Sequence, residues 1–341
     1  MKTILTTFTV VVLAALAGCK GVGEGKEPVS EKEKLSREGK VLLTVDFEPG
    51  KPLQYKFVSS REVEINWDPT GESSRSRAST VNKHTESVEM VVAYTPTEVD
   101  PYGLTTIKAT CKTVKATRSR RPSGRAGGKD AVEYARGKTF TFTVGPTGKM
   151  EDNSQLDKLI REIGEKVFRP DDGTGRRIKE PDMIGDFVAS QWFLWDSISS
   201  IQKPSEGVAV GQTWKSKLSV PTPMVMRKAR DVTYTLSQVR QSEGGQVADI
   251  HSTYSLAESA PSTWPIPYSG RFMMAGTFGF LRGYKIQELT GEGEELFNID
   301  AGRIERHSQQ YQMRMSAFVP LGIDASPQVT IKQKLTMQLL K

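Results

Sequence analysis

Hydrophobic and polar residues alternate along two long stretches of the chain, a pattern typical of β-strands with one buried face. The first stretch covers residues 41–152 and opens with a predicted short strand at 41–47. The apolar positions of the next predicted strand share one face: Tyr55, Phe57, Val63, Ile65 and Trp67. A returning strand repeats the pattern with Val88, Met90 and Val92. This stretch therefore predicts an antiparallel sheet with one solvated face.

The second alternating stretch covers residues 205–341. Its predicted strands are 214–220, 232–239, 247–256, 278–289, 296–299, 304–315 and 329–340. A weak internal echo links the two stretches, because residues 142–151 and 297–305 both contain an aromatic strand, a turn and a Gly-basic-apolar-Glu sequence. Duplication and the shared needs of two β-hairpins explain this echo equally well.

Between these stretches, residues 153–204 change to helical spacing. The first predicted helix begins at Ser154 as N-cap with Asp157 three residues on, and the second begins at Asp182 and ends before Pro204. The second has a wide apolar stripe, which indicates burial. We therefore expect an α+β fold, predominantly antiparallel twisted β-sheet in two regions, with two central α-helices packed against it.

The N-terminal residues 1–18 have the layout of an export signal, with Lys2 followed by an apolar run and small residues at the end. The sequence Leu16-Ala17-Gly18-Cys19 resembles the lipobox of bacterial lipoproteins, which implies cleavage after Gly18 and fatty acylation of Cys19. A retained transmembrane helix needs about 20 apolar residues, more than this run offers. An ordinary cleaved signal with a chance cysteine is the other alternative. Residues 19–40 are polar and glycine-rich, as in a flexible tether.

This resemblance implies a lipid-anchored protein of the cell envelope. Lys20 follows the lipobox cysteine, and the absence of aspartate there favours the periplasmic face of the outer membrane over the inner membrane. Once Cys19 is acylated, Cys111 is the only free thiol and no intrachain disulfide can form. Its place in an alternating run predicts a small buried hydrophobe.

The net charge of +7 comes mainly from residues 115–138, which hold eight basic and two acidic residues. Within this basic loop, the candidate anion-binding residues are Arg118, Arg120, Arg121 and Arg125. Such a cluster can attract an anionic envelope lipid or polysaccharide, whereas nucleic acid is not an expected partner of an exported chain. A solvated loop without a partner is the alternative.

We find no motif that specifies catalysis, a metal site or a cofactor. The three histidines, His84, His251 and His307, stand far apart and have no paired-ligand spacing, so we expect surface or strand positions for them. The run 171–175 has the residues of a calcium or carboxylate-dyad loop but falls short of the 12-residue calcium pattern, and ordinary turn chemistry explains it. Gly276 to Gly279 predicts a bulge in a strand or a close backbone approach.

Aromatic side chains of the second predicted helix offer a candidate apolar-ligand site, formed by Phe187, Trp192 and Trp195. Aromatic residues at helical spacing also occur in ordinary cores. Both interpretations remain open.

The body of the chain resembles a family of uncharacterised, mainly antiparallel-β envelope lipoproteins. The resemblance rests on the lipobox, the Gly211-Gln212-Thr213-Trp214 strand entry and the Gly302-Arg303-Ile304 turn. We expect a non-catalytic binding or scaffolding lipoprotein, with an apolar or lipid ligand held between sheet and helices. The alternative is an envelope hydrolase with a site assembled from distant residues.

Overall fold

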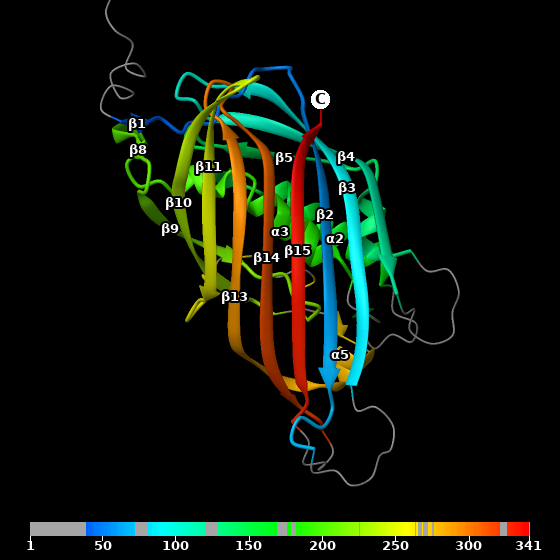
Figure 1. Ribbon diagram of the computed structural model, residues 1–341. Coiled ribbons are helices and arrows are strands. Elements are labelled where there is room, and N and C mark those ends of the chain that lie inside the picture. The colour runs from blue at the N-terminus through cyan, green and yellow to red at the C-terminus, as the bar shows by residue number, and fades with distance from the viewer. Residues whose placement is uncertain are drawn as a thin grey trace, which may run out of the picture.

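The computed structural model describes residues 39–71, 81–119, 129–168, 176–178, 182–224, 226–262, 264, 268, 272–274, 276–320 and 326–340 (Figure 1). The lipobox residues Gly18 and Cys19, and Arg120, Arg121 and Arg125 of the basic loop, lie outside these ranges.

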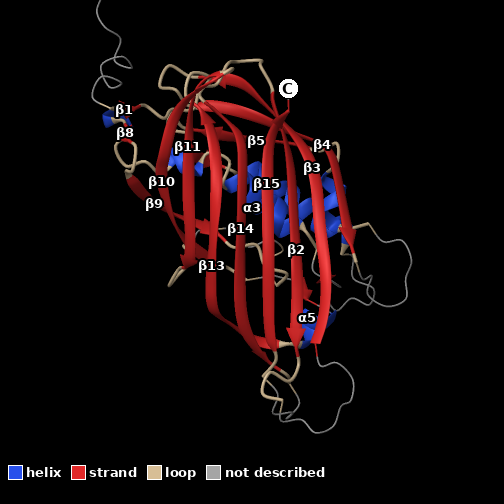
Figure 2. Cartoon of the chain, viewed as in Figure 1, coloured by secondary structure: helices blue, strands red, loops and turns tan. Residues whose placement is uncertain are grey.

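Antiparallel β-strands make up most of the described chain, and a few helices accompany them, so the fold is broadly α+β (Figure 2). The strands are β1 (Lys40–Val41), β2 (Leu53–Asn66), β3 (Val81–Val99), β4 (Thr105–Arg118), β5 (Thr139–Val144), β6 (Met150–Asp152), β7 (Arg176–Ile178), β8 (Val208–Ala209), β9 (Thr213–Ser219), β10 (Ala229–Ser242), β11 (Gly245–Leu256), β12 (Phe272–Met274), β13 (Arg282–Asn298), β14 (Arg303–Phe318) and β15 (Gln328–Leu340). The helices are the 3₁₀ turns η1 (Ala131–Ala135) and η2 (Pro204–Glu206) and the α-helices α2 (Ser154–Val167), α3 (Ile184–Trp192), α4 (Asp196–Ser199) and α5 (Gly276–Phe280).

The two alternating stretches of the sequence form one sheet of 11 strands in the order β6-β5-β4-β3-β2-β15-β14-β13-β11-β10-β9. Strands β2 and β15 join them, running antiparallel in register from Gln54 opposite Leu340 to Asn66 opposite Gln328. Each arm of the sheet is a meander of sequential neighbours. The helices lie on one face of this sheet (Figure 1), so inward side chains of both arms meet the same helical layer.

Several predicted element boundaries were wrong. The predicted strand at 41–47 is a strand only at Lys40–Val41, although Leu43 and Val45 are buried. The separate predicted strands 278–289 and 296–299 are one strand, β13, and Phe278 lies instead in the short helix α5 together with Gly276 and Gly279. The predicted bulge is therefore wrong, but the alternative of a close backbone approach is confirmed, because a Cβ at Gly279 would clash with the carbonyl group of Met274.

Helix α2 has the predicted apolar stripe, with Leu156, Leu159, Ile160 and Ile163 buried. Its N-cap is Asn153 rather than Ser154, and the carboxylate of Asp152 accepts the backbone N–H of Ser154. The second predicted helix is interrupted by a turn after Trp192 and resumes as α4. The N-cap of α3 is Met183 rather than the predicted Asp182, whose carboxylate accepts the backbone N–H of Ile184 at 3.0 Å.

The hairpin turns of the sequence echo both pack against the segment 44–47. Gly148, in the β5–β6 turn, has φ +84°, and a Cβ there would lie 2.9 Å from a methyl carbon of Val45. Gly302, in the β13–β14 turn, has φ +57°, and its Cβ would lie 2.5 Å from that of Asp46. Its carbonyl accepts the N–H of Asp46 at 2.9 Å. Glycine at both turns therefore lets one segment hold the two arms of the sheet together.

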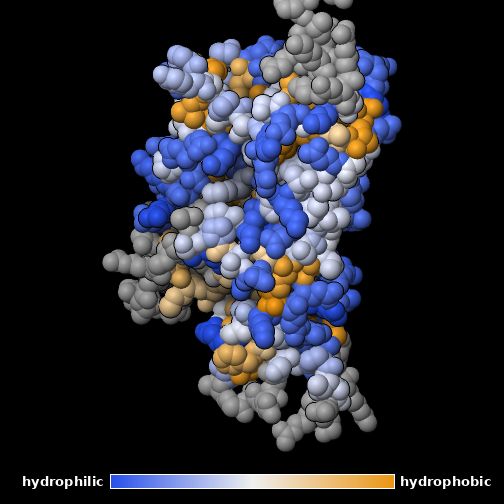
Figure 3. All heavy atoms as spheres, turned by 90° about the vertical axis from the view of Figure 1, so that its left-hand side faces the viewer, coloured by the Kyte–Doolittle hydropathy of each residue, from blue (hydrophilic) through white to orange (hydrophobic). Residues whose placement is uncertain are grey.

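No helix within the described residues has the length and apolar character that crossing a membrane requires. The face near β9 is mostly hydrophilic, and its apolar patches are small and separated by polar side chains (Figure 3). Cys111 is buried in the core, as predicted, and burial raises the pKa of its thiol to about 12.

Candidate functional site

A row of residues, six of seven with polar side chains, crosses the buried face of the sheet, one residue per strand. The strand register pairs each of these residues with the next across the sheet: Arg118 (β4), Glu86 (β3), Arg61 (β2), Gln333 (β15), Tyr311 (β14), Gly291 (β13) and Tyr254 (β11). We refer to these seven residues as the polar row. On β2 it interrupts an apolar face, because Ser59 and Arg61 lie between Phe57 and Val63 and all four are at most 2% exposed.

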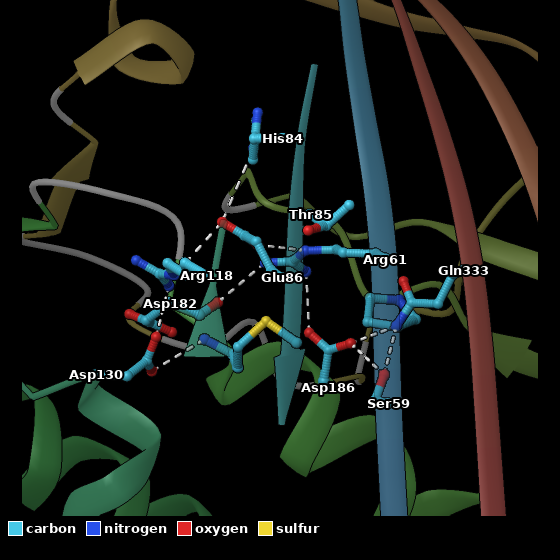
Figure 4. A network of polar contacts seen from close by, with 12 residues as sticks. Ser59, Arg61, His84, Thr85, Glu86, Arg118, Asp130, Asp182, Asp186 and Gln333 are labelled. Atoms are coloured by element: carbon cyan, nitrogen blue, oxygen red, sulfur yellow. Dashed lines mark hydrogen bonds and ion pairs between the residues drawn. The ribbon is translucent and has the colours of Figure 1, made fainter. Parts of the chain in front are cut away.

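Arg61 is the most fully paired member of the polar row. Its guanidinium lies 2.6 Å from the carboxylate of Glu86 and 2.9 Å from that of Asp186 on α3, and all three side chains are at most 3% exposed. Burial opposes its charged form, but the two carboxylates outweigh burial and raise the pKa of Arg61. Figure 4 shows Arg61 between the two carboxylates.

The second carboxylate, Asp186, connects the helix to the strands at the centre of the sheet. It accepts hydrogen bonds from the hydroxyl of Ser59 on β2 at 2.8 Å and from the amide of Gln333 on β15. Gln333 in turn donates to Ser59 at 2.8 Å. Because a buried carboxylate must be hydrogen-bonded or paired, these contacts fix where α3 sits on the sheet.

At the other side of Arg61, Arg118 continues the network into η1. Its guanidinium pairs with Asp130 at 2.5 Å and lies 3.5 Å from Glu86. Asp130 caps η1 by accepting the N–H of Val132, and it also accepts the N–H of Met183 at 3.2 Å. Arg118, a predicted anion-binding residue, thus forms ion pairs within the fold, and its role toward an external anion stays a prediction. The anion-binding role of Arg120, Arg121 and Arg125 stays a prediction.

Asp182 lies at the junction between this network and a small apolar pocket. Its backbone carbonyl is 3.5 Å from Arg61 Nη2, and burial together with the charge of Asp130 raises the pKa of its carboxyl to about 8. Tyr268 lies close by with φ 58°, a strained backbone conformation for a non-glycine residue. Burial first, and then the charges of Asp182 and Asp130, raise the pKa of the Tyr268 hydroxyl. A protonatable acid thus faces this pocket.

The pocket lies between the start of α3 and the segment 219–228 and has a volume of about 70 Å³. Its wall contains Asp182, Gly185, Val188, Ala189, Ser219, Val220, Pro221, Thr222, Pro223, Met224, Met226, Arg227, Lys228, Trp264 and Tyr268. Arg227 closes one side by donating from Nε to the carbonyl of Trp264 at 2.9 Å. A water molecule needs about 10–15 Å³ of such a cavity. The pocket therefore has room for about five waters or a short apolar group.

The aromatic residues predicted to hold a ligand do not line this pocket. Phe187 is 0% exposed and packs against Phe140, and Trp195 is 3% exposed and packs among Phe47, Tyr94 and Phe142. Both therefore belong to the core. Trp192 is half-buried, and its ring centroid lies 6.1 Å from that of Trp264, which does line the pocket.

The three histidines all lie in strands, as predicted: His84 in β3, His251 in β11 and His307 in β14. His307 is buried, stacks on Phe193 and contacts Glu295 through Nδ1 at 3.0 Å. No group of three or more metal-ligating side chains occurs within the described part of the chain.

Glu295 also accepts a hydrogen bond from the hydroxyl of Ser197. In a serine hydrolase the imidazole lies between the serine and the acid, so that it can take the proton of the nucleophile. Here the acid lies between serine and imidazole, and Ser197 is 1% exposed. This cluster therefore has the arrangement of a buried structural network and lacks that of a nucleophile with its base.

A second, larger hollow lies on the opposite, solvated face of the sheet. It measures about 1000 Å³. Its lining contains outward-facing residues of β2, β3, β4, β13, β14 and β15 or next to them: Ser60, Glu62, Thr85, Ser87, Thr117, Ser119, Thr290, Glu292, Gln310, Gln312, Lys332 and Lys334. Six members of the polar row, which lie between these positions on the same strands, also line it: Arg61, Glu86, Arg118, Gly291, Tyr311 and Gln333. Its lining contains hydroxyl side chains together with acidic and basic ones. Such a surface suits a hydrated polar ligand rather than an apolar one.

Sequence reasoning missed the polar row, although a signal for it was present. Arg61 and Glu86 occupy inward positions of alternating strands, in phase with Phe57 and Met90. A charged residue in the buried phase of a strand calls for a buried partner. The sequence shows this need on each strand separately, and only the register shows that the positions coincide.

Comparison with protein-family models and with curated proteins finds no match. Among solved structures, a lipovitellin structure that describes lipid–protein interactions aligns with a TM-score of 0.39 and 10% identity over 87% of this chain and 26% of that chain. A mutant of Rh. blastica porin aligns with a TM-score of 0.17 and 8% identity over 85% of this chain and 99% of that chain. The chain thus spans about a quarter of the lipovitellin length, and neither likeness bears on the function.

Proposed function

We propose that this chain is a membrane-anchored envelope lipoprotein whose non-catalytic body binds an apolar or lipid ligand between the sheet and the helices. The lipobox at Leu16 to Cys19 supports the anchor. The pocket beside Asp182 supports the binding part of the proposal, because its wall combines apolar side chains such as Val188 and Val220 with polar ones such as Asp182, as ligand sites usually do. The chain faces the periplasm from the outer membrane.

The size of the pocket sets a condition on this proposal. Ligand pockets usually measure about 300–1,000 Å³, several times the 70 Å³ found here. The pocket therefore takes only the end of an apolar chain unless its wall moves. Met224 and Met226 form part of that wall. Methionine side chains are flexible enough to reshape an apolar surface, so we place the movement at this segment.

Lipid extraction tests the binding directly. The full chain, purified from its native host, is extracted with organic solvent and the extract is analysed by mass spectrometry, with native mass spectrometry of the untreated chain beside it. We expect one class of apolar compound in constant proportion to protein. A chain that yields no compound beyond its own anchor contradicts the binding part of the proposal.

Substitution at Gly185 tests the location. A Cβ built there meets only the carbonyl oxygen of Thr222 at 3.9 Å, so a side chain can enter the pocket without a clash. We expect Gly185→Leu to lower the amount of co-purified ligand at least five-fold, and the matched control Gly185→Ala to lower it little. Equal ligand content in both variants places the ligand elsewhere.

The anchor is tested by intact mass measurement of the chain from its host. We expect a mature N-terminus at Cys19 that bears fatty acids, and Cys19→Ser should abolish both cleavage and acylation. A mature chain without fatty acid contradicts the lipoprotein assignment.

The hollow on the solvated face favours a second candidate, the binding of an anionic envelope polysaccharide. Lys332 and Lys334 lie there among hydroxyl side chains, together with Glu62 and Glu292, and Lys332 is 4.0 Å from the carboxylate of Glu62. We expect Lys332→Glu with Lys334→Glu to abolish retention on immobilised acidic polysaccharide, while the control Lys51→Glu, away from the hollow, leaves retention unchanged. Retention that survives the double substitution contradicts this candidate.

A further inference from the structure

One buried arginine has no anionic partner among the described residues. Arg230, on β10, is 1% exposed. Its Nη2 donates to the side-chain oxygen of Gln309 at 2.9 Å. Its Nε and Nη1 have no hydrogen-bond partner within the described part of the chain. A cation in this position lacks the pairing that buried charges usually have.

Two tyrosines of the polar row face this guanidinium. Its central carbon lies 4.5 Å from the ring centroid of Tyr254 and 5.1 Å from that of Tyr311. Glycine makes this arrangement possible on the strand between them. A Cβ at Gly291 would lie 2.5 Å from the Cβ of Tyr311, and one at Gly293 would lie 2.5 Å from the hydroxyl of Tyr254. Tyr254, Tyr311 and Gln309 thus form a preformed cradle around one positive charge.

The tyrosine rings and the amide do not offset the cost of burying this charge. A buried ion loses its hydration and usually recovers this loss through an oppositely charged partner, and cation–π contacts supply only part of it. Burial and the charges of Glu295 and Asp196 raise the pKa of Tyr254, and the charge of Arg230 acts to lower that of Asp196, but neither carboxylate forms an ion pair with Arg230 in the described chain. An additional anion at the free Nε and Nη1 would supply the missing pairing.

We propose that Arg230, with Tyr254, Gln309 and Tyr311, binds the carboxylate head group of an acidic amphiphile such as a fatty acid. This inference rests on the proposed apolar-ligand function and names the polar end of the ligand. Pro221 connects the two regions, because it lines the pocket beside Asp182 and its carbonyl accepts the Tyr311 hydroxyl at 3.5 Å. The apolar tail lies on the pocket side of Pro221, and the head group lies at Arg230.

Calorimetric titration of the full chain with three probes tests this assignment: oleate, methyl oleate and acetate. Oleate and its methyl ester share the apolar tail and differ in the charged head group. We expect oleate to bind at least ten-fold more tightly than methyl oleate, and acetate to bind weakly. Arg230→Met should remove the ten-fold preference and leave methyl oleate binding unchanged. The control Arg240→Met, on the same strand but exposed beside Asp249, should keep the preference.

The outcomes separate this inference from the function on which it rests. If oleate and methyl oleate bind equally, the apolar-ligand function stands and the assignment to Arg230 fails. If neither binds, the proposed function fails. If acetate binds as tightly as oleate, the site takes a free small anion and the amphiphile assignment fails. Should Arg230→Met not fold, Arg230→Gln takes its place and should lose the preference for oleate. Arg230→Lys keeps a cation and should retain that preference.

Discussion

The two buried arginines of the sheet differ in what surrounds them. Arg61 lies between two carboxylates, those of Glu86 and Asp186, at 2.6 and 2.9 Å. Arg230 faces two tyrosine rings and one amide oxygen. Both are as buried as any apolar core residue. The pairing at Arg61 is complete within the chain, which suits a structural role. The pairing at Arg230 is incomplete, which suits a site that awaits an anion.

The largest effect should follow from removing Arg61. Breaking a buried ion pair from one side costs about 3–5 kcal/mol because it leaves an uncompensated charge. Arg61→Met leaves two buried carboxylates, so we expect a loss of at least this size in the free energy of unfolding, measured by urea denaturation. The triple variant Arg61→Met, Glu86→Gln, Asp186→Asn should recover most of it. A small loss in the single variant would show that the network is not structural.

Arg230→Met should act in the opposite direction in the absence of ligand. Replacing a buried charge by a packed apolar side chain is often neutral or stabilising by about 1–4 kcal/mol. We therefore expect the melting temperature of the ligand-free chain to stay equal or to rise. A fall comparable to that of Arg61→Met would mean that Arg230 stabilises the fold as Arg61 does, and the contrast between the two residues would disappear.

Asp182, which lies near Arg61, should make the free energy of unfolding depend on pH. Its carboxyl has an ordinary pKa of 3.8 in the unfolded chain and one raised to about 8 in the folded chain. The folded state therefore keeps a proton that the unfolded state releases, and stability falls as pH rises from about 4 to 8. Each pKa unit corresponds to about 1.4 kcal/mol, so a change of at least this size is expected.

The matched substitution is Asp182→Asn, which keeps the acceptor for the Ile184 N–H and removes the titration. We expect this variant to gain stability over the parent at pH 8.5 and to gain little at pH 5, as read from denaturation midpoints. The half-exposed Asp231 serves as control, because Asp231→Asn should show no such dependence. A constant difference across pH would show that the Asp182 carboxyl is ionised throughout.

Alternation along the strands made most of the sheet predictable, including the inward positions of Phe57, Val88 and Met90. It could also have shown that Arg61 and Arg230 occupy inward positions, in phase with apolar neighbours on β2 and β10. It could not show their partners. Asp186 is 125 residues from Arg61, and Gln309 is 79 residues from Arg230. These contacts depend on the order of strands and on the register between β2 and β15, which local pattern does not determine.

The candidate ligand site illustrates the same limit at the level of a helix. Phe187 and Trp195 were correctly placed in an apolar stripe, but helical spacing does not tell which side of the stripe meets the sheet. The sheet takes up these two rings, and the pocket lies instead at Gly185, Val188 and Ala189. Small side chains leave space where large ones fill it, so the pocket is found at the least conspicuous positions of α3.

The smallest expected effect concerns the charge balance around Arg230. Burial raises the pKa of the Asp196 carboxyl to about 6. Hydrogen bonds from Tyr234 and Ser216 and the charge of Arg230 act in the opposite direction and limit this rise. Arg230→Met removes that favourable charge, so the pKa of Asp196 should rise above 6, as followed by carboxyl carbon NMR. Oleate bound to the parent chain would neutralise Arg230 and should shift the Asp196 pKa in the same direction. An unchanged pKa in both experiments would show that the charge of Arg230 is already balanced within the chain, as that of Arg61 is.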